Sequence, residues 1–453
     1  MAKSKTLYFC TNCGYESPKW VGRCPSCGEW NSFTEEVVTA TKRGGTGRRS
    51  AERATPVALS DVTPGGGARI ATGIGEVDRL LGGGGVVKGS LLLMGGEPGI
   101  GKSTLALQIA VGVGGRRVLY VSGEESEQQI KLRAERLEGS NDECLLLGET
   151  DVDAIINSAV AAKPELLIVD SVQTLSTQGL DSAAGSVSQI RESASRLLRY
   201  TKESGIPVVL IGHITKDGTL AGPKVLEHIV DVVLLFEGDT DHLYRILRAT
   251  KNRFGSTAEL GIFEMTASGL HQVANPSGIF INRYDEVLSG VAVAAVVDGL
   301  RPFMIETQAL VSSAVYGTPQ RSSTGFDTRR LNMLLAVLEK RAGFKLAMRD
   351  VFLNIAGGLK VSDPATDLAV AAAVLSSNLD IPLAGEICFA GEVGLSGEIR
   401  PVARIEQRMK EASRLGFKKI VISRYHRSDS LPDAGIEPMS AGRVEAVVKM
   451  LFS

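Results

Sequence analysis

One run of residues restricts the fold of this chain more than any other: Gly95-Gly96-Glu97-Pro98-Gly99-Ile100-Gly101-Lys102-Ser103-Thr104. From Gly96 it fits G-x-x-x-x-G-K-[ST], the phosphate-binding loop of nucleoside triphosphatases. The apolar run Ser90–Met94 before it is typical of a buried strand, and Leu105–Ala110 after it is typical of a helix. This strand–loop–helix context is the one in which such a loop binds phosphates.

The loop predicts a site for ATP and Mg²⁺. Its glycines let successive backbone N–H groups converge on phosphate oxygens, next to the N-terminal end of a helix. Lys102 is expected to act catalytically on the β- and γ-phosphates, and the Ser103 hydroxyl to ligate Mg²⁺. The alternative is a glycine-rich turn that binds nothing. The expected nucleotide-binding residues here are Gly96, Glu97, Pro98, Gly99, Ile100, Gly101, Lys102, Ser103 and Thr104.

Acidic residues follow two further strands of a region, residues 66–275, in which strands and helices alternate. This alternation predicts a mainly parallel sheet with helices on both faces, and ligands bind at the carboxyl ends of such strands. Glu124 or Glu125 is therefore placed to deprotonate an attacking water, although Glu125 could instead cap the next helix. Asp170 ends the apolar run 166–169 and is expected to hold Mg²⁺ through water.

Other polar residues extend this predicted site. His213 follows a third strand and is a candidate sensor of the γ-phosphate, with a structural histidine as the alternative. Lys251 and Arg253 lie two apart on an extended segment, so both can point one way into the nucleotide of a neighbouring copy; a solvated turn is the alternative. Lys216 and Lys224 are candidate DNA contacts in a loop after a strand.

Four cysteines near the N-terminus have metal-ligand spacing. Cys10 and Cys13 form one C-x-x-C pair, and Cys24 and Cys27 form a second after ten intervening residues. This pattern predicts a closed, structural Zn²⁺ site in a domain of residues 1–35, with incidental thiols or a redox pair as the alternative. Trp20 and Trp30 are expected in its small core, rather than as platforms for stacking bases. The isolated Cys144 and Cys388 are expected to be buried.

Composition limits the functional classes. The formal net charge is −1, with 43% apolar and 22% charged residues, so a polyanion would have to bind a local basic patch. Residues 36–65 form a polar, glycine-rich linker. No signal peptide or membrane-length apolar run is evident, which predicts a cytoplasmic protein without membrane partners.

The last region, residues 280–453, has a mixed α+β pattern. Asp327 is expected to cap a helix that ends before Gly343, and Asp363-Pro364 to begin an Ala-rich helix through Leu375. Glycines at 391 and 397 predict a hairpin up to Ile399. An amphipathic helix over 403–415 would lead to a strand over 419–423.

Together these motifs resemble the RadA (Sms) family of bacterial DNA repair and recombination proteins over nearly the whole chain. The Lys251-Asn252-Arg253-Phe254-Gly255 string is the most specific part of the match. The resemblance implies a RecA-like ATPase core that assembles as a homo-hexameric ring. It also implies translocation on single-stranded DNA and branch migration of recombination intermediates together with RecA.

The resemblance further implies a C-terminal domain similar to the Lon protease domain. Where Lon has its serine nucleophile this chain has Ala365, and near the position of the Lon lysine it has Arg408. An alanine offers no nucleophile and an arginine is not a neutral base at ordinary pH, so a non-proteolytic scaffold is expected. An ATP-switched recombination mediator that does not unwind DNA, and an ATP-dependent protease, are the rival functions.

Overall fold

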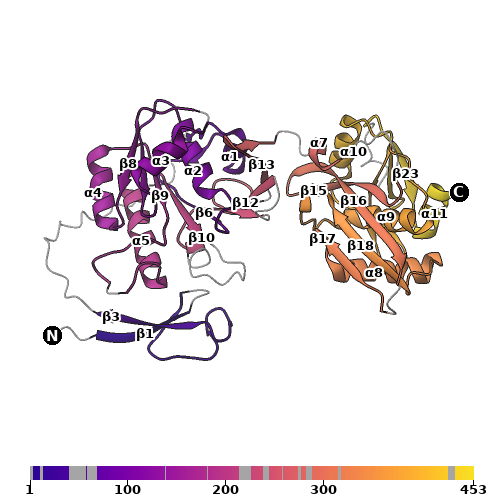
Figure 1. Cartoon of the computed structure of the whole chain (residues 1–453), viewed down its shortest axis with the longest axis horizontal. Coiled ribbons are helices and arrows are strands. Elements are labelled where there is room, and N and C mark those ends of the chain that lie inside the picture. The colour runs from indigo at the N-terminus through magenta and orange to yellow at the C-terminus, as the bar shows by residue number, and fades with distance from the viewer. Residues whose placement is uncertain are drawn as a thin grey trace. The chain divides into compact units, whose positions relative to one another are not determined.

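The computed structural model describes residues 4–10, 14–39, 58, 69–137, 139–180, 182–213, 226–237, 244–257, 259–273, 277–281, 288–314, 318–426 and 434–453. The chain divides into two compact units, Met1–Gln272 and Val273–Ser453 (Figure 1). The predicted linker, residues 36–65, begins inside a strand that ends at Thr39. Beyond Thr39, Ala58 is the linker residue that the structure describes.

The first unit is built on a nine-stranded sheet in the order β14-β13-β12-β11-β6-β10-β9-β7-β8. The strands from β11 to β8 in this sheet order run parallel to one another. On the other side of β11, the strands β12, β13 and β14 extend the sheet, each antiparallel to its neighbour. The predicted, mainly parallel sheet is therefore confirmed. The strands are β6 (Leu91–Gly96), β7 (Val118–Ser122), β8 (Cys144–Gly148), β9 (Leu166–Asp170), β10 (Val208–His213), β11 (Val232–Glu237), β12 (Tyr244–Asn252), β13 (Leu260–Thr266) and β14 (Gly269–Gln272).

Helices cover both faces of this sheet, because its central strands are apolar along their whole length. On one face Leu105, Ile109 and Ile130 of α2 and α3 pack in the same buried cluster as alternate residues of β6 and β9. On the other face α4 and α5 pack against the remaining alternate residues, with Ile155 and Leu197 in the second cluster. The helices are α1 (Gly75–Leu80), α2 (Lys102–Gly112), α3 (Glu127–Ala134), α4 (Val152–Ala162) and α5 (Val187–Ser204).

A small three-stranded sheet stands at the N-terminus, in the order β2-β1-β3. Its strands are β1 (Ser4–Cys10), β2 (Glu16–Ser17) and β3 (Phe33–Thr39). A further pair, β4 (Arg69–Ile70) and β5 (Val86–Val87), precedes the central strand β6.

The second unit is a seven-stranded mixed sheet, in the order β17-β18-β16-β15-β19-β22-β23, with helices packed on it. Its strands are β15 (Val291–Asp298), β16 (Arg301–Ser313), β17 (Arg321–Thr324), β18 (Arg349–Ile355), β19 (Ile387–Ala390), β22 (Lys419–Ser423) and β23 (Glu437–Ala441). Its helices are α7 (Ser277–Phe280), α8 (Thr328–Ala342), α9 (Asp367–Leu379), α10 (Ile405–Arg414) and α11 (Val444–Phe452).

Several boundaries predicted in this unit are confirmed. The Asp327 side chain caps α8 and Gly343 ends it in a left-handed conformation. The hairpin forms from β20 (Glu392–Val393) and β21 (Ile399–Arg400). The helix expected from Asp363 begins later, because Pro364–Thr366 first make a 3₁₀ turn.

The two positions that depart from the Lon pattern are buried in this unit. Ala365 has no exposed surface, and Arg408 is 3% exposed. The Arg408 guanidinium donates to Asp363 Oδ2 at 2.5 Å, to Ala295 O at 2.7 Å and to Ala403 O at 2.9 Å. These bonds make Arg408 a structural cation that ties α10 to β15. Among the described residues, no helix has the length and apolarity needed to cross a bilayer.

Candidate functional site

The phosphate loop joins the end of the central strand β6 to the start of α2. Gly99 has φ of +76° and Gly101 has φ of +114°, conformations that favour glycine. At Gly101 a side-chain carbon would also lie 2.8 Å from the terminal methyl of Met265, which would have to move. The first turn of α2 then carries Lys102 and Ser103 at the carboxyl edge of the sheet.

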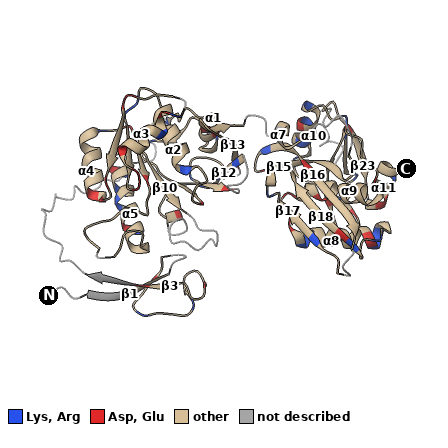
Figure 2. Ribbon diagram, in the orientation of Figure 1, with Lys and Arg blue, Asp and Glu red and all other residues tan. Residues whose placement is uncertain are grey.

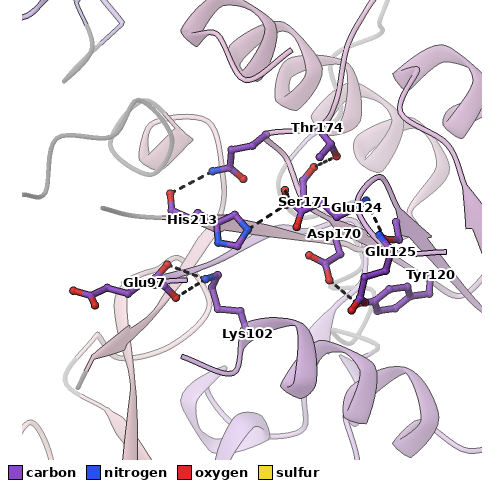
Figure 3. Close-up of polar contacts among 12 residues, drawn as sticks. Glu97, Lys102, Tyr120, Glu124, Glu125, Asp170, Ser171, Thr174 and His213 are labelled. Atoms are coloured by element: carbon purple, nitrogen blue, oxygen red, sulfur yellow. Dashed lines mark hydrogen bonds and ion pairs between the residues drawn. The ribbon is translucent and has the colours of Figure 1, made fainter. Parts of the chain in front are cut away.

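Lys102 is buried and folds back over the loop. Its Nζ donates to the carbonyl oxygens of Gly96 at 2.9 Å and Glu97 at 2.8 Å (Figure 3). Burial lowers the pKa of Lys102 to about 8, against the opposing charges of Asp170, Glu124 and Glu97. A triphosphate in the loop would stabilise the charged ammonium and raise this pKa again.

Asp170 ends β9 and is held by a tyrosine from the neighbouring strand. The Tyr120 hydroxyl donates to Asp170 Oδ2 at 2.8 Å, and both side chains are buried. Burial, and then the charge of Asp170, raise the pKa of Tyr120 well above its usual range, so the hydroxyl remains a donor. The second carboxylate oxygen is left to face the loop, as a magnesium-holding acid requires (Figure 3).

The two adjacent glutamates have different surroundings. Glu124 Oε1 accepts a hydrogen bond from Ser171 Oγ at 2.6 Å, and His213 Nε2 lies 3.6 Å from the same oxygen. Glu125 instead pairs with Arg133 on α3 at 2.8 Å. The residue that caps α3 is Ser126, in a capping box with Gln129, so Glu125 does not cap that helix.

His213 ends β10 in register with Gly96 of β6, which places it beside the phosphate loop. Figure 3 shows His213, Glu124, Asp170 and Lys102 converging on one space from four different segments. The structure thus brings together the residues expected to hold and cleave a triphosphate. The individual roles assigned to them stay predictions.

Lys251 and Arg253 do not lie in this cluster. Lys251 lies near the end of β12, and Arg253 directly follows that strand. Asn252, the last residue of β12, is in register with Val232 and therefore with Leu92, near the start of β6. Lys251 Nζ donates to the carbonyl oxygens of Glu227 at 2.5 Å and Val230 at 2.8 Å. Arg253 pairs with the buried Asp231 at 3.1 Å while its side chain stays 58% exposed. Both cations therefore occupy the edge of the sheet opposite the phosphate loop.

Some predicted residues cannot be placed, and some site residues were not predicted. Lys216 and Lys224 lie outside the described residues. The sequence did not single out Tyr120, Ser171 or Asp231. The sequence does contain a signal for Ser171, because this residue directly follows the acid that ends β9. The contacts of Tyr120 and Asp231 depend on strand register, which the sequence does not show.

Three of the four predicted metal ligands cluster in the N-terminal sheet. The Sγ atoms of Cys10, Cys24 and Cys27 lie within 4.8 Å of one another, and Cys10 Sγ is 3.7 Å from Cys27 Sγ. Tetrahedral zinc with bonds of about 2.3 Å separates its sulfur ligands by about 3.8 Å, so the donor set fits zinc. Cys13 lies outside the described residues. The isolated Cys388 is buried as expected, whereas Cys144 is only half-buried.

The tryptophans expected in the core of this metal-binding segment are instead on its surface. Trp20 is 51% exposed and Trp30 is 66% exposed. The apolar interior consists of Cys10, Cys24 and Phe33, with Tyr8 and Val21 packed against it. The prediction was wrong because so few residues enclose the metal that the segment has no interior in which an indole could be buried.

Comparisons with known proteins agree with this arrangement. Three family models match: "AAA domain" over residues 54–219, "Rubredoxin metal binding domain" over residues 8–35 and "Subunit ChlI of Mg-chelatase" over residues 307–426. Together with the sheet topology, they confirm the predicted fold class: an α/β RecA-like P-loop core, an N-terminal metal-binding ribbon and an α+β Lon-protease-like region.

Curated relatives match over the full length of the chain. The chain is 46% identical over 457 residues to "DNA repair protein RadA" of Bacillus subtilis (strain 168), covering 99% of each. It is 47% identical over 454 residues to the protein of that name from Streptococcus pyogenes serotype M6, and 46% identical over 454 residues to the one from Pseudomonas aeruginosa, with 100% of each covered. A solved KaiC-like protein from Pyrococcus horikoshii OT3 is 20% identical with a TM-score of 0.37, covering 45% of this chain and 98% of that one.

The lowered pKa of Lys102 predicts that ATP binding takes up a proton in alkaline solution. With a pKa of about 8 the free lysine is mostly neutral at pH 9, and bound phosphates would restore its charge. Uptake should be about 0.9 proton per site at pH 9 and about 0.1 at pH 7. Titration calorimetry in buffers of different ionisation enthalpy measures this. Lys102→Arg, which cannot lose its proton, is the control, and equal uptake at the two pH values would contradict the prediction.

The sulfur cluster predicts about one zinc per chain in protein purified without chelator. Cys24→Ser and Cys27→Ser should each lose most of it, because a hydroxyl does not replace a thiolate ligand. Cys144→Ser and Cys388→Ser are the matched controls, since neither thiol belongs to the cluster. Elemental analysis measures the metal, and full zinc content in the Cys24 variant would refute the assignment.

Proposed function

The chain belongs to the RadA family of DNA repair proteins, and from this premise we propose that it is a DNA-dependent ATPase working as a ring of six copies. The ring moves along single-stranded DNA and promotes branch migration of recombination intermediates together with RecA. The P-loop ATPase core is shared with the matched family. Ring formation, translocation and the partnership with RecA are the parts that we propose.

The observation that carries this proposal is the position of Lys251 and Arg253. They stand where β6 begins, whereas the phosphate loop follows its end. Arg253 N donates to Asp231 O, and Asp231 N donates to Leu91 O. Arg253 therefore lies level with Leu91, about 17 Å before Gly96 and beyond the reach of its side chain.

Lys251 is level with Leu93, about 10 Å before Gly96. Its Nζ is bound to the carbonyl oxygens of Glu227 and Val230. If these cations act on a nucleotide, it belongs to another copy. Repeated head-to-tail contacts form a ring where the rotation closes and a filament where it does not, and we propose the ring.

Each proposed site lies between two copies and takes residues from both. The loop amides and Lys102 bind the β- and γ-phosphates, and Ser103 with Asp170 would hold Mg²⁺, which neutralises phosphate charge when bound. Glu124 is the general base, because Ser171 orients its carboxylate and Arg133 already neutralises Glu125. The proposed roles of the remaining residues are sensing of the γ-phosphate by His213 and charge stabilisation from the neighbouring copy by Lys251 and Arg253.

Movement of loops in the ring channel would carry the DNA strand. Lys216 and Lys224 are the proposed contacts, and phosphate contacts of this kind make binding salt-sensitive and weakly selective for sequence. Acidic and basic residues are scattered over both units (Figure 2), in keeping with a net charge of −1. We place this work in the cytoplasm, without membrane partners.

The proposed functions divide the chain into four regions, of which the last serves as architecture. Residues 1–35 form the zinc-binding domain, 36–65 a linker, 66–275 the ATPase domain and 280–453 a Lon-like domain without peptidase activity. The last assignment rests on Ala365, which has no nucleophile, and on Arg408, whose guanidinium is occupied by Asp363 and two carbonyls. Degradation of casein by the purified protein would contradict it.

A mixing experiment tests whether Arg253 acts on a neighbour. Lys102→Ala and Arg253→Ala should each abolish or strongly reduce ATP turnover while leaving assembly intact. In an equal mixture, about one interface in four pairs an intact phosphate loop with an intact Arg253, so turnover should partly return. The control mixes Lys102→Ala with a Lys102→Ala, Arg253→Ala double variant, which restores no site. Absence of recovery in rings shown to be mixed would refute action between copies.

A forked duplex separates translocation from its rival, a mediator that ATP merely locks onto DNA. The proposed motor should displace one strand in an ATP-dependent reaction, and Lys102→Ala should displace none. The mediator would bind the fork equally well and leave the duplex intact. Strand displacement followed by gel electrophoresis measures the difference, and DNA-stimulated ATP turnover without displacement would favour the mediator.

A further inference from the structure

The N-terminal metal-binding segment displays two large aromatic side chains to solvent. Trp20 is 51% exposed and Trp30 is 66% exposed, and they are the two tryptophans of the whole chain. Indole is among the largest apolar groups that a protein can bury, so two exposed indoles on a segment this small suggest a binding role.

The two indoles flank the same glycine. A side-chain carbon on Gly22 would lie 3.7 Å from Trp20 and 3.9 Å from Trp30, which is ordinary van der Waals contact. An edge atom of each six-membered ring therefore lies within 4 Å of one point beside Gly22, where the backbone carries no side chain.

A cation is fixed against Trp30. The Arg23 guanidinium carbon lies 5.7 Å from the centre of the Trp30 ring, and Arg23 Nε donates to Gly28 O at 3.0 Å. Arg23 and Trp30 are bridge partners in the loop that carries the second cysteine pair. Their backbone is held by Asn31 N to Gly22 O and by Cys24 N to Glu29 O, each at 2.8 Å. The metal-binding loop thus orders the aromatic surface before any ligand arrives.

We propose that Trp20, Trp30 and Arg23 form a platform on which unpaired bases of single-stranded DNA stack. The proposal rests on the proposed function, which puts such DNA at this protein. Aromatic faces with an arginine beside them bind single strands in a sequence-tolerant way, because every base has a π-face. A protein partner would favour a broader apolar patch, whereas here the cationic Arg23 lies against the Trp30 ring.

Local charge argues that stacking dominates this contact. Residues 1–39 carry no net charge, because their four basic residues are balanced by four acids: Lys3, Lys5, Lys19 and Arg23 against Glu16, Glu29, Glu35 and Glu36. Attraction of phosphates by this segment is therefore weak. Its contribution to DNA affinity should depend on the presence of bases and change little with salt, unlike contacts made to phosphates elsewhere in the ring.

Tryptophan fluorescence, excited at a wavelength that tyrosine does not absorb, tests the platform in the full-length protein, because Trp20 and Trp30 are its two tryptophans. Oligothymidylate should quench it, and an abasic oligodeoxyribose phosphate of the same length should not. Trp20→Phe and Trp30→Phe each leave a single reporter, and both should still be quenched. Trp30→Ala should weaken binding of labelled oligothymidylate about five- to one-hundred-fold, whereas Trp30→Phe retains most of the affinity.

The outcomes separate this inference from the proposed function. Unchanged zinc content and DNA-free ATP turnover in the variants show that the fold is intact. If labelled oligothymidylate binds and stimulates ATP turnover but tryptophan emission stays constant, the platform is refuted and the proposed function stands. Equal quenching by the abasic strand, or quenching by RecA without DNA, also refutes the platform. If no single strand binds at all, both ideas fail.

Discussion

The parallel strands of the large sheet all end at one edge, and the candidate site depends on that alignment. Register places Ser122 opposite Asp170 and Gly96 opposite His213. The register of the strands alone therefore brings the loops that follow them next to one another. Because alternate residues of each strand pack into two different buried clusters, a slip of one residue would exchange the side chains between the clusters and mismatch their packing. The core itself therefore fixes the position of the predicted catalytic groups.

At the opposite edge of the sheet, the buried Asp231 binds several hydrogen-bond donors. Its carboxylate accepts hydrogen bonds from Leu91 N at 3.1 Å, Lys202 Nζ at 2.9 Å and Arg253 Nη1 at 3.1 Å. A buried carboxylate with one partner would be left uncompensated if that partner moved away. Asp231 keeps Lys202 and the amide of Leu91, so the proposed movement of Arg253 to a neighbour's phosphates would leave this carboxylate with two partners.

Sequence alone predicts the groups that sit at strand ends, and it does so for a physical reason. The glycine loop and Asp170 are each marked by an apolar run that stops at a polar residue. The choice between Glu124 and Glu125 could not be predicted, because it depends on Arg133 one helix away and on Ser171 one strand away. Likewise the edge occupied by Lys251 and Arg253 follows from the antiparallel direction of β12, which no local pattern reveals.

The tryptophans illustrate a different limit. An apolar residue is expected inside when burial is the main source of folding free energy, and on that reasoning Trp20 and Trp30 belong in the core. In a metal-binding segment the ligand bonds supply that free energy instead, on the order of 10 kcal/mol or more for structural zinc. Burying two indoles of about 150–250 Å² each would contribute about 8–12 kcal/mol at about 25 cal/mol per Å². The metal supplies free energy of that size without them, so the segment can fold with both indoles at its surface, where they are available to contact something else.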